Sequence, residues 1–122
     1  MTLQELYQNI DGDYEQAIRV LRMDKLLDKY IRKLAANGVV DALLEAGESL
    51  DPTRMFETAH AVKGVCANLG LVKLASMASE LSEEFRPGNP WTCSDDEVSA
   101  KVQSIREQYE KTCAGIAQYE QG

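Results

Sequence analysis

The chain of 122 residues is poor in the residue types that bind metal ions or form covalent cross-links. It has 1 histidine and 3 cysteines, and Cys66, Cys93 and Cys113 lie far apart in the sequence. A disulfide framework needs an even set of cysteines, and a zinc site needs paired ligands at short spacings. The sequence therefore predicts no disulfide framework and no metal site, with Cys66 and Cys113 as small core residues.

Long apolar runs are also absent. No stretch approaches the roughly 20 apolar residues that span a bilayer, and the first residues lack the basic and apolar segments of a signal peptide. We therefore expect a cytoplasmic protein without a membrane partner. Strand signals are sparse too, because alternation of apolar and polar residues is short and β-branched residues are few.

Basic residues are in the minority, with 13 Lys and Arg against 20 Asp and Glu and a net charge of -7. This excess of negative charge argues against sequence-independent binding of nucleic acid or of anionic lipid, so we expect protein partners. The length is that of one domain, and we expect residues 1–122 to form a single domain.

Helical periodicity fills most of the chain. Thr2 with Glu5 and Ser94 with Glu97 form capping boxes, and Asp51 precedes a proline that suits a first helical turn. The expected helical segments are 3–9, 14–21, 24–49, 52–69, 71–85 and the residues that follow Ser94.

Two features inside this pattern leave the local structure open. Asn37-Gly38 separates two apolar stripes that point roughly 100° apart, which fits either one kinked helix or two joined helices. Trp91 lies in the loop before the last helix, where we expect it to plug one end of the fold. Four substantial amphipathic helices with short connections predict an all-α, antiparallel four-helix bundle, with a core at about 24–119 and the two N-terminal helices packed across one end.

His60 is the most informative residue of the chain. When residues 53–69 are wound at about 100° per residue, His60 points away from the apolar stripe. Phe56, Lys63, Gly64 and Ala67 lie within roughly 60° of it on the same face. The imidazole is thus expected to face solvent beside one aromatic ring, one cation and two small residues.

An exposed histidine is most often a tolerated surface residue, but these neighbours favour a site. The ring of Phe56 on the solvent face is better explained by a docking patch than by the core. Gly64 costs about 1 kcal/mol relative to alanine inside a helix, which suggests that another molecule approaches the backbone there.

We expect His60 to act as a nucleophile without neighbouring side chains that assist catalysis. A neutral imidazole at cytoplasmic pH leaves one ring nitrogen free to attack. No serine, cysteine or carboxylate is placed to form a catalytic constellation with it, and a convex helix face excludes no water. Lys63, one turn later, would partly neutralise a phosphoryl group on the ring.

The string His60-Ala61-Val62-Lys63-Gly64, with Leu69-Gly70 downstream, resembles the signature of histidine-containing phosphotransfer (HPt) domains. The similarity extends over roughly residues 14–119, since the expected helices resemble the other members of that bundle. Cys66 departs mildly from the pattern, because the family often has a small residue there.

This resemblance implies a phosphorelay intermediate and not an enzyme. His60 would accept a phosphoryl group from the aspartyl phosphate of a receiver domain, in a response regulator or a hybrid histidine kinase, and pass it to another receiver. Lys63 would lie beside the phosphate, while Phe56, Gly64 and Ala67 would form the docking surface. No cofactor of its own is implied, because the magnesium ion would belong to the receiver, and we expect a monomer.

Two other readings stay open at this point. A related interaction module could dock on receivers or kinases without carrying phosphate. A phosphohistidine phosphatase or a histidine-based hydrolase would instead turn over a phosphorylated substrate, which the lack of a catalytic partner for His60 disfavours.

Overall fold

The computed structural model describes residues 1–89 and 91–121, which form eight helices and no strand. The all-α class expected from the sequence is confirmed. In chain order the helices are α1 (Leu3–Asn9), α2 (Tyr14–Leu21), α3 (Asp24–Arg32), α4 (Leu34–Asn37), α5 (Val39–Ser49), α6 (Pro52–Asn68), α7 (Val72–Glu84) and α8 (Asp95–Gln121).

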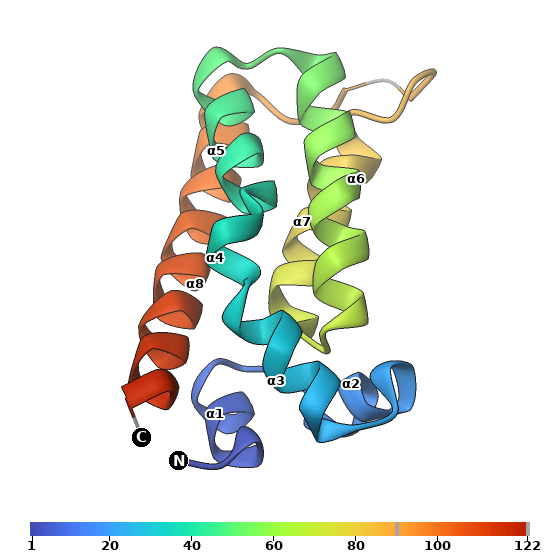
Figure 1. Ribbon diagram of the computed structural model, residues 1–122. Helices are drawn as coiled ribbons and strands as arrows, with labels where there is room; N and C mark the ends of the chain where they lie inside the picture. Colours follow the sequence, from blue (N-terminus) through green and yellow to red (C-terminus); the bar gives the residue numbers. More distant parts are fainter. Residues whose placement is uncertain (90, 122) are drawn as a thin grey trace.

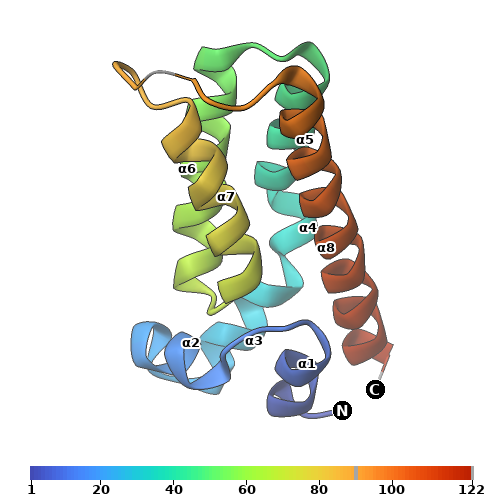
Figure 2. The same ribbon diagram turned by 180° about the vertical axis from the view of Figure 1, so that it is seen from behind.

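Helices α5 to α8 form the expected antiparallel bundle, in which each helix runs against the next (Figures 1 and 2). α6 packs on α5 and α7, and α8 closes the ring by packing on the same two helices. Each helix turns one apolar stripe inward, as Leu43, Met55, Leu74 and Ile105 show with exposed fractions of at most 1%. Burial of these stripes is the main force that holds the bundle together.

The first three helices lie across one end of this bundle, where α6 ends and α7 begins (Figure 1). α1 packs on α8, α2 packs on α6, and α3 packs on α2 and α8. The expected position of the two N-terminal helices is confirmed, and α3 joins them there. The opposite end carries the loops that connect α5 with α6 and α7 with α8.

The segment 24–49 breaks twice, which differs from both alternatives left open by the sequence. Gly38 has a φ of 76° and separates α4 from α5, as its position between two apolar stripes suggests. A second break lies at Lys33, whose amide donates a hydrogen bond to the carbonyl of Tyr30 in a tighter turn. No residue in the sequence predicts this break. Three helices therefore replace the single kinked helix or the pair.

The expectation that Trp91 plugs the end of the bundle is wrong. Its side chain is 59% exposed, and its ring rests edge-on against Phe85 with the ring centroids 5.7 Å apart. Phe85, which is 9% exposed, closes the core at this end of the bundle and occupies the place expected for Trp91.

The cysteines behave largely as small core residues. Cys66 is fully buried, and burial raises the pKa of its thiol to about 12. Cys113 is half-buried, and all three cysteines are free thiols in the described residues. The expectation for Cys66 is confirmed, and Cys113 packs against the core from its edge.

Candidate functional site

His60 lies in the middle of α6 with its side chain exposed, as the helical periodicity predicts. Ala59 and Val62, on the opposite side of the helix, are fully buried. The helix begins where the sequence indicates, because the carboxylate of Asp51 accepts a hydrogen bond from the amide of Thr53 at 3.1 Å. The imidazole is therefore carried on a rigid helix that is anchored along its other side.

The C-terminal end of α6 is held by the helices that cross the bundle end. The buried hydroxyl of Tyr7 donates a hydrogen bond to the carbonyl of Leu69 at 2.6 Å. The side-chain amide of Gln16 donates to the carbonyl of Ala67 at 3.2 Å. The last carbonyls of a helix have no partner within the helix, so α1 and α2 satisfy groups that would otherwise be unpaired.

Gly70 ends α6 as the sequence predicts, and it permits a close approach. Its φ is 69°, and its carbonyl accepts a hydrogen bond from the amide of Asp13 at 2.7 Å. A Cβ atom at this position would lie 2.4 Å from the carbonyl oxygen of Asp13. Glycine is thus required both by the left-handed backbone and by the chain that crosses it.

Phe56 contacts the ring of His60 directly. The two rings stack with their centroids 5.9 Å apart and their planes at 21°. Phe56 is half-buried and packs against the core, so it is less exposed than expected for a residue of a solvent face. The stack restricts the orientations of the imidazole, because aromatic pairs favour such offset arrangements.

The other predicted site residues surround the imidazole on the same helix face. Lys63 is exposed, and no ion pair within the described residues involves it. A Cβ atom added to Gly64 would have nothing within 4 Å, so no neighbour in the fold demands a glycine there. Ala67 is half-buried one turn further on. The backbone after His60 is therefore open to an approaching molecule.

The ring of His60 has no polar partner among the described residues. In the part of the protein that the structure describes, no hydrogen bond or ion pair joins the imidazole to another side chain. Residues 1–89 and 91–121 also contain no group of three His, Cys, Asp or Glu side chains that could hold a metal ion. The arrangement suits an exposed nucleophile whose reaction partner brings the catalytic groups.

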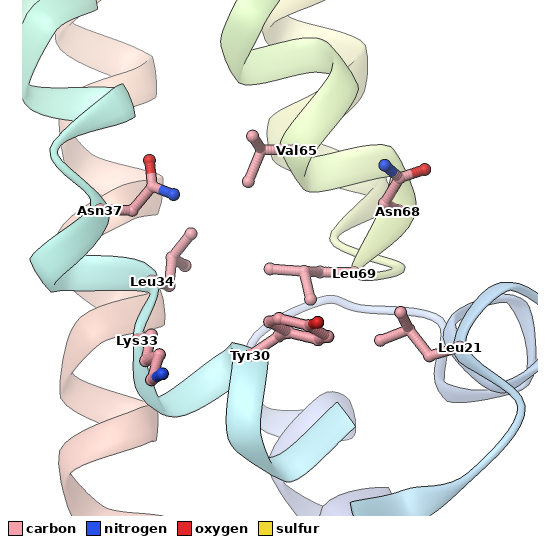
Figure 3. Close-up of a pocket in the computed structure, with 8 residues that line it drawn as sticks. All are labelled: Leu21, Tyr30, Lys33, Leu34, Asn37, Val65, Asn68 and Leu69. Carbon is pink, nitrogen blue, oxygen red and sulfur yellow. The ribbon is translucent and has the colours of Figure 1, made fainter. Parts of the chain in front are cut away.

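A hollow of about 470 Å³ lies beside the C-terminal half of α6, and the sequence did not predict it (Figure 3). Its walls come from α2, α3, α4 and the end of α6. The side chains that line it are Leu21, Tyr30, Lys33, Leu34, Asn37, Val65, Asn68 and Leu69. Tyr30 and Leu34 lie on either side of the break between α3 and α4 at Lys33, which no local sequence signal specifies.

A family model described as the Hpt domain matches residues 2–114, nearly the whole chain. The chain belongs to the Hpt domain family. Comparisons with curated proteins and with solved structures give no significant match. The resemblance inferred from the residues around His60 is thereby confirmed at the level of the family.

Hpt domains are phosphocarrier modules rather than enzymes, and membership of this family supports a general role in phosphorelay phosphotransfer. It also implies interaction with partners of the receiver type. In residues 1–89 and 91–121, none of the helices is sufficiently long and apolar to cross a membrane.

Proposed function

We propose that this Hpt protein is a phosphorelay intermediate in which His60 carries the phosphoryl group. A receiver domain bearing an aspartyl phosphate donates the group, and another receiver accepts it. The observation that carries the proposal is the exposed imidazole of His60, which within residues 1–89 and 91–121 has no hydrogen-bond or ion-pair partner and stacks on the ring of Phe56. Family membership supplies the reaction class.

The transfer needs one bond to form and one to break. The lone pair of a neutral imidazole nitrogen forms the N–P bond, while the P–O bond to the aspartyl oxygen of the receiver breaks. The aspartate leaves as a carboxylate, and the other ring nitrogen of His60 keeps its proton. Passing the group to another receiver reverses these steps with a new aspartate as the nucleophile.

Lys63 and Gly64 have separate roles in this proposal. A phosphoryl group brings a charge of roughly -2, by analogy with phosphorylated hydroxyl residues. The ammonium of Lys63, one turn from His60, partly neutralises that charge. Gly64 leaves the backbone accessible, so that the receiver approaches the imidazole closely. The magnesium ion and the acidic groups that bind it belong to the receiver.

The experiment that tests the proposal is label transfer from a phosphorylated receiver domain. We expect the wild-type protein to gain phosphate that is labile in acid and stable in alkali, and His60→Gln to gain none. A second receiver added to the purified labelled protein is expected to remove the label. Uptake of label by folded His60→Gln would contradict the assignment of His60.

The same experiment separates the other two readings. A docking module without phosphate transfer would bind the receiver equally well in wild type and His60→Gln, and neither would be labelled. A phosphatase or hydrolase would release inorganic phosphate catalytically, over many turnovers. Either result would overturn the carrier role.

We also propose that residues 1–122 act as a single, monomeric domain in the cytoplasm. The net charge of -7 supports the monomeric state, because like charge opposes self-association. Light scattering across a range of protein concentrations is expected to give the mass of one chain. A mass that doubles at micromolar concentration would contradict it.

A further inference from the structure

A groove of about 500 Å³ lies between the N-terminal end of α6 and the loop that follows α7. This loop projects beside the start of α6 in both views of the molecule (Figures 1 and 2). Its apolar walls are formed by Pro52 and Phe56 on α6 and by Phe85, Pro87 and Trp91 on the other side. The groove therefore lies at the opposite end of α6 from the hollow of Figure 3.

Trp91 is the most exposed large apolar residue of the part of the chain that the structure describes, at 59%. Its ring contacts Phe85 edge-on, and the residue lines the groove while most of its surface stays exposed. Exposed tryptophan is unfavourable in water and is enriched among the residues that dominate protein interfaces. The core does not explain its position, because Phe85 already closes this end of the bundle.

Hydrogen bonds to the end of α7 hold described residues on both sides of Trp91. The carboxylate of Glu84 accepts hydrogen bonds from the amides of Thr92 at 2.5 Å and Cys93 at 2.7 Å. These bonds hold the pKa of the Glu84 carboxyl below its usual range. The side-chain amide of Asn89 donates to the carbonyl of Glu83 at 2.7 Å. Restraint of the flanking residues reduces the conformational entropy that is lost when a partner covers the aromatic side chain.

Phe56 connects this groove with the imidazole of His60. Its ring is part of the groove wall and also stacks on the ring of His60. A specific interface covers about 800 Å² on each partner, which is a disc of roughly 16 Å radius. One helical turn is about 5.4 Å, so a partner that reaches His60 also covers Phe56 and the adjoining groove.

The charges at the groove indicate what enters it. Glu57 and Arg86 line it with opposite signs, and the remaining walls are mainly apolar. An apolar side chain is therefore favoured over a phosphate or an acidic peptide. We infer that Trp91 and this groove form a specificity contact, which binds an apolar side chain that the receiver carries near its acceptor aspartate. The inference rests on the proposed function and names a contact for that same site.

Trp91 is the sole tryptophan of the chain, so its fluorescence reports on this contact directly. We expect the emission to shift when the receiver that labels His60 is titrated against the protein. Trp91→Ala is expected to raise the receiver concentration for half-maximal transfer rate by about 5- to 30-fold, with the maximal rate retained. Trp91→Phe is expected to recover part of this loss.

Val72→Ala is the matched control, because Val72 is an exposed apolar residue at the far end of α7. It is expected to leave the half-maximal concentration unchanged. The inference is overturned if Trp91→Ala transfers with wild-type concentration dependence, or if saturating receiver leaves the emission unchanged.

Two further outcomes are distinguishable. Emission that changes with the concentration of the protein alone would identify the groove as a self-association surface and would also overturn the inference. Absence of label on the wild-type protein with every receiver would remove the proposed function itself and the inference with it.

Discussion

At the scale of single residues, the neighbours of His60 differ in what they do for the imidazole. Phe56 touches the ring, with the centroids 5.9 Å apart, and so limits its orientation. Lys63 is exposed and free of ion pairs among the described residues, which leaves its charge available to a bound phosphoryl group. A Cβ atom at Gly64 would meet no neighbouring element of the fold. Packing within the fold therefore does not explain this glycine, and we propose that approach of the partner does.

Replacing Gly64 with alanine separates stability from function. A methyl group there meets no atom of the fold within 4 Å, so Gly64→Ala is expected to stabilise the protein by up to about 1 kcal/mol. The same methyl group obstructs the receiver, so transfer to His60 is expected to slow by about tenfold. Urea unfolding and label-transfer rates measure the two effects.

Higher stability combined with an unchanged transfer rate would show that Gly64 is not needed for approach of the receiver. Gly64→Glu extends the series with a larger and charged side chain, and its obstruction is expected to be stronger. The stripe formed by Val62 and Cys66 lies on the other side of the helix and remains buried in both variants.

The residue pattern predicted much of this site. Helical periodicity alone predicted that His60 is exposed and that Lys63 and Gly64 lie beside it, because a helix fixes the direction of its side chains. It could not predict that Phe56 is half-buried or that Trp91 faces solvent. Both depend on how α7 and its following loop pack on α6, which is tertiary information.

At the scale of elements, α6 is fixed at both ends. Asp51 caps its first turn, and the carbonyls of its last turn are paired with α1, α2 and the chain between them. The short N-terminal helices therefore act on the site through α6. They hold the helix that carries His60 without lying beside the imidazole themselves.

Tyr7 provides the test of this role. Tyr7→Phe keeps the ring in the core but leaves the carbonyl of Leu69 without its buried donor, which is expected to destabilise the protein by about 1 to 2 kcal/mol. The matched control is Tyr30→Phe, since Tyr30 is 43% exposed and its change is expected to stay within about 0.5 kcal/mol. Thermal or urea unfolding measures both.

Equal stabilities of Tyr7→Phe and the wild type would contradict this account of the end of α6. The pH dependence gives a second check. Burial raises the pKa of Tyr7 far above its usual range, so the folded state holds the phenolic proton more tightly than the unfolded state. The contribution of this proton to the free energy of unfolding is present below about pH 10 and is lost as the pH rises further. Tyr7→Phe has no phenolic proton, so its stability is expected not to fall for this reason.

The sequence predicted the elements that carry local start and stop signals. Thr2 with Glu5, Asp51 before Pro52 and Gly70 act through neighbouring residues, so their effect is visible in the sequence. The break at Lys33 has no cap residue and no glycine or proline in the sequence. In the structure it is a tighter turn, in which the amide of Lys33 donates to the carbonyl of Tyr30. Packing on the bundle end determines it.

At the scale of the whole molecule, Asp11 ties the crossing helices to the bundle. Its carboxylate lies 2.8 Å from the ammonium of Lys111 on α8 and 3.8 Å from that of Lys73 on α7. Gln108 donates a further hydrogen bond to it at 3.3 Å. Three segments that are far apart in the sequence thus meet at one acidic residue.

Asp11→Asn tests this contact through its pH dependence. The hydrogen bonds from Lys111 and Gln108 lower the pKa of the Asp11 carboxyl. Its contribution to stability is therefore present above the ordinary value of about 4 and is lost as the pH falls through the lower folded value. Asparagine suits the left-handed φ of 58° at this position, so the substitution removes charge without backbone strain.

We expect Asp11→Asn to be less stable than the wild type at pH 7, with a difference that shrinks as the pH falls below about 4. Urea midpoints across the pH range measure it. Removing one negative charge from a chain of net charge -7 relieves repulsion, which acts in the opposite direction. A variant at least as stable as the wild type at pH 7 would show that the contacts of Asp11 give no net stabilisation beyond the repulsion that its charge adds.

The central claim is that the phosphoryl group resides on a ring nitrogen of His60. Nuclear magnetic resonance of ¹⁵N-labelled protein tests this directly, because the chain has 1 histidine and its ring signals need no further assignment. After incubation with a phosphorylated receiver, we predict one imidazole nitrogen with a one-bond coupling to ³¹P. Imidazole nitrogens that stay uncoupled while phosphate accumulates on another residue, or on none, would contradict it.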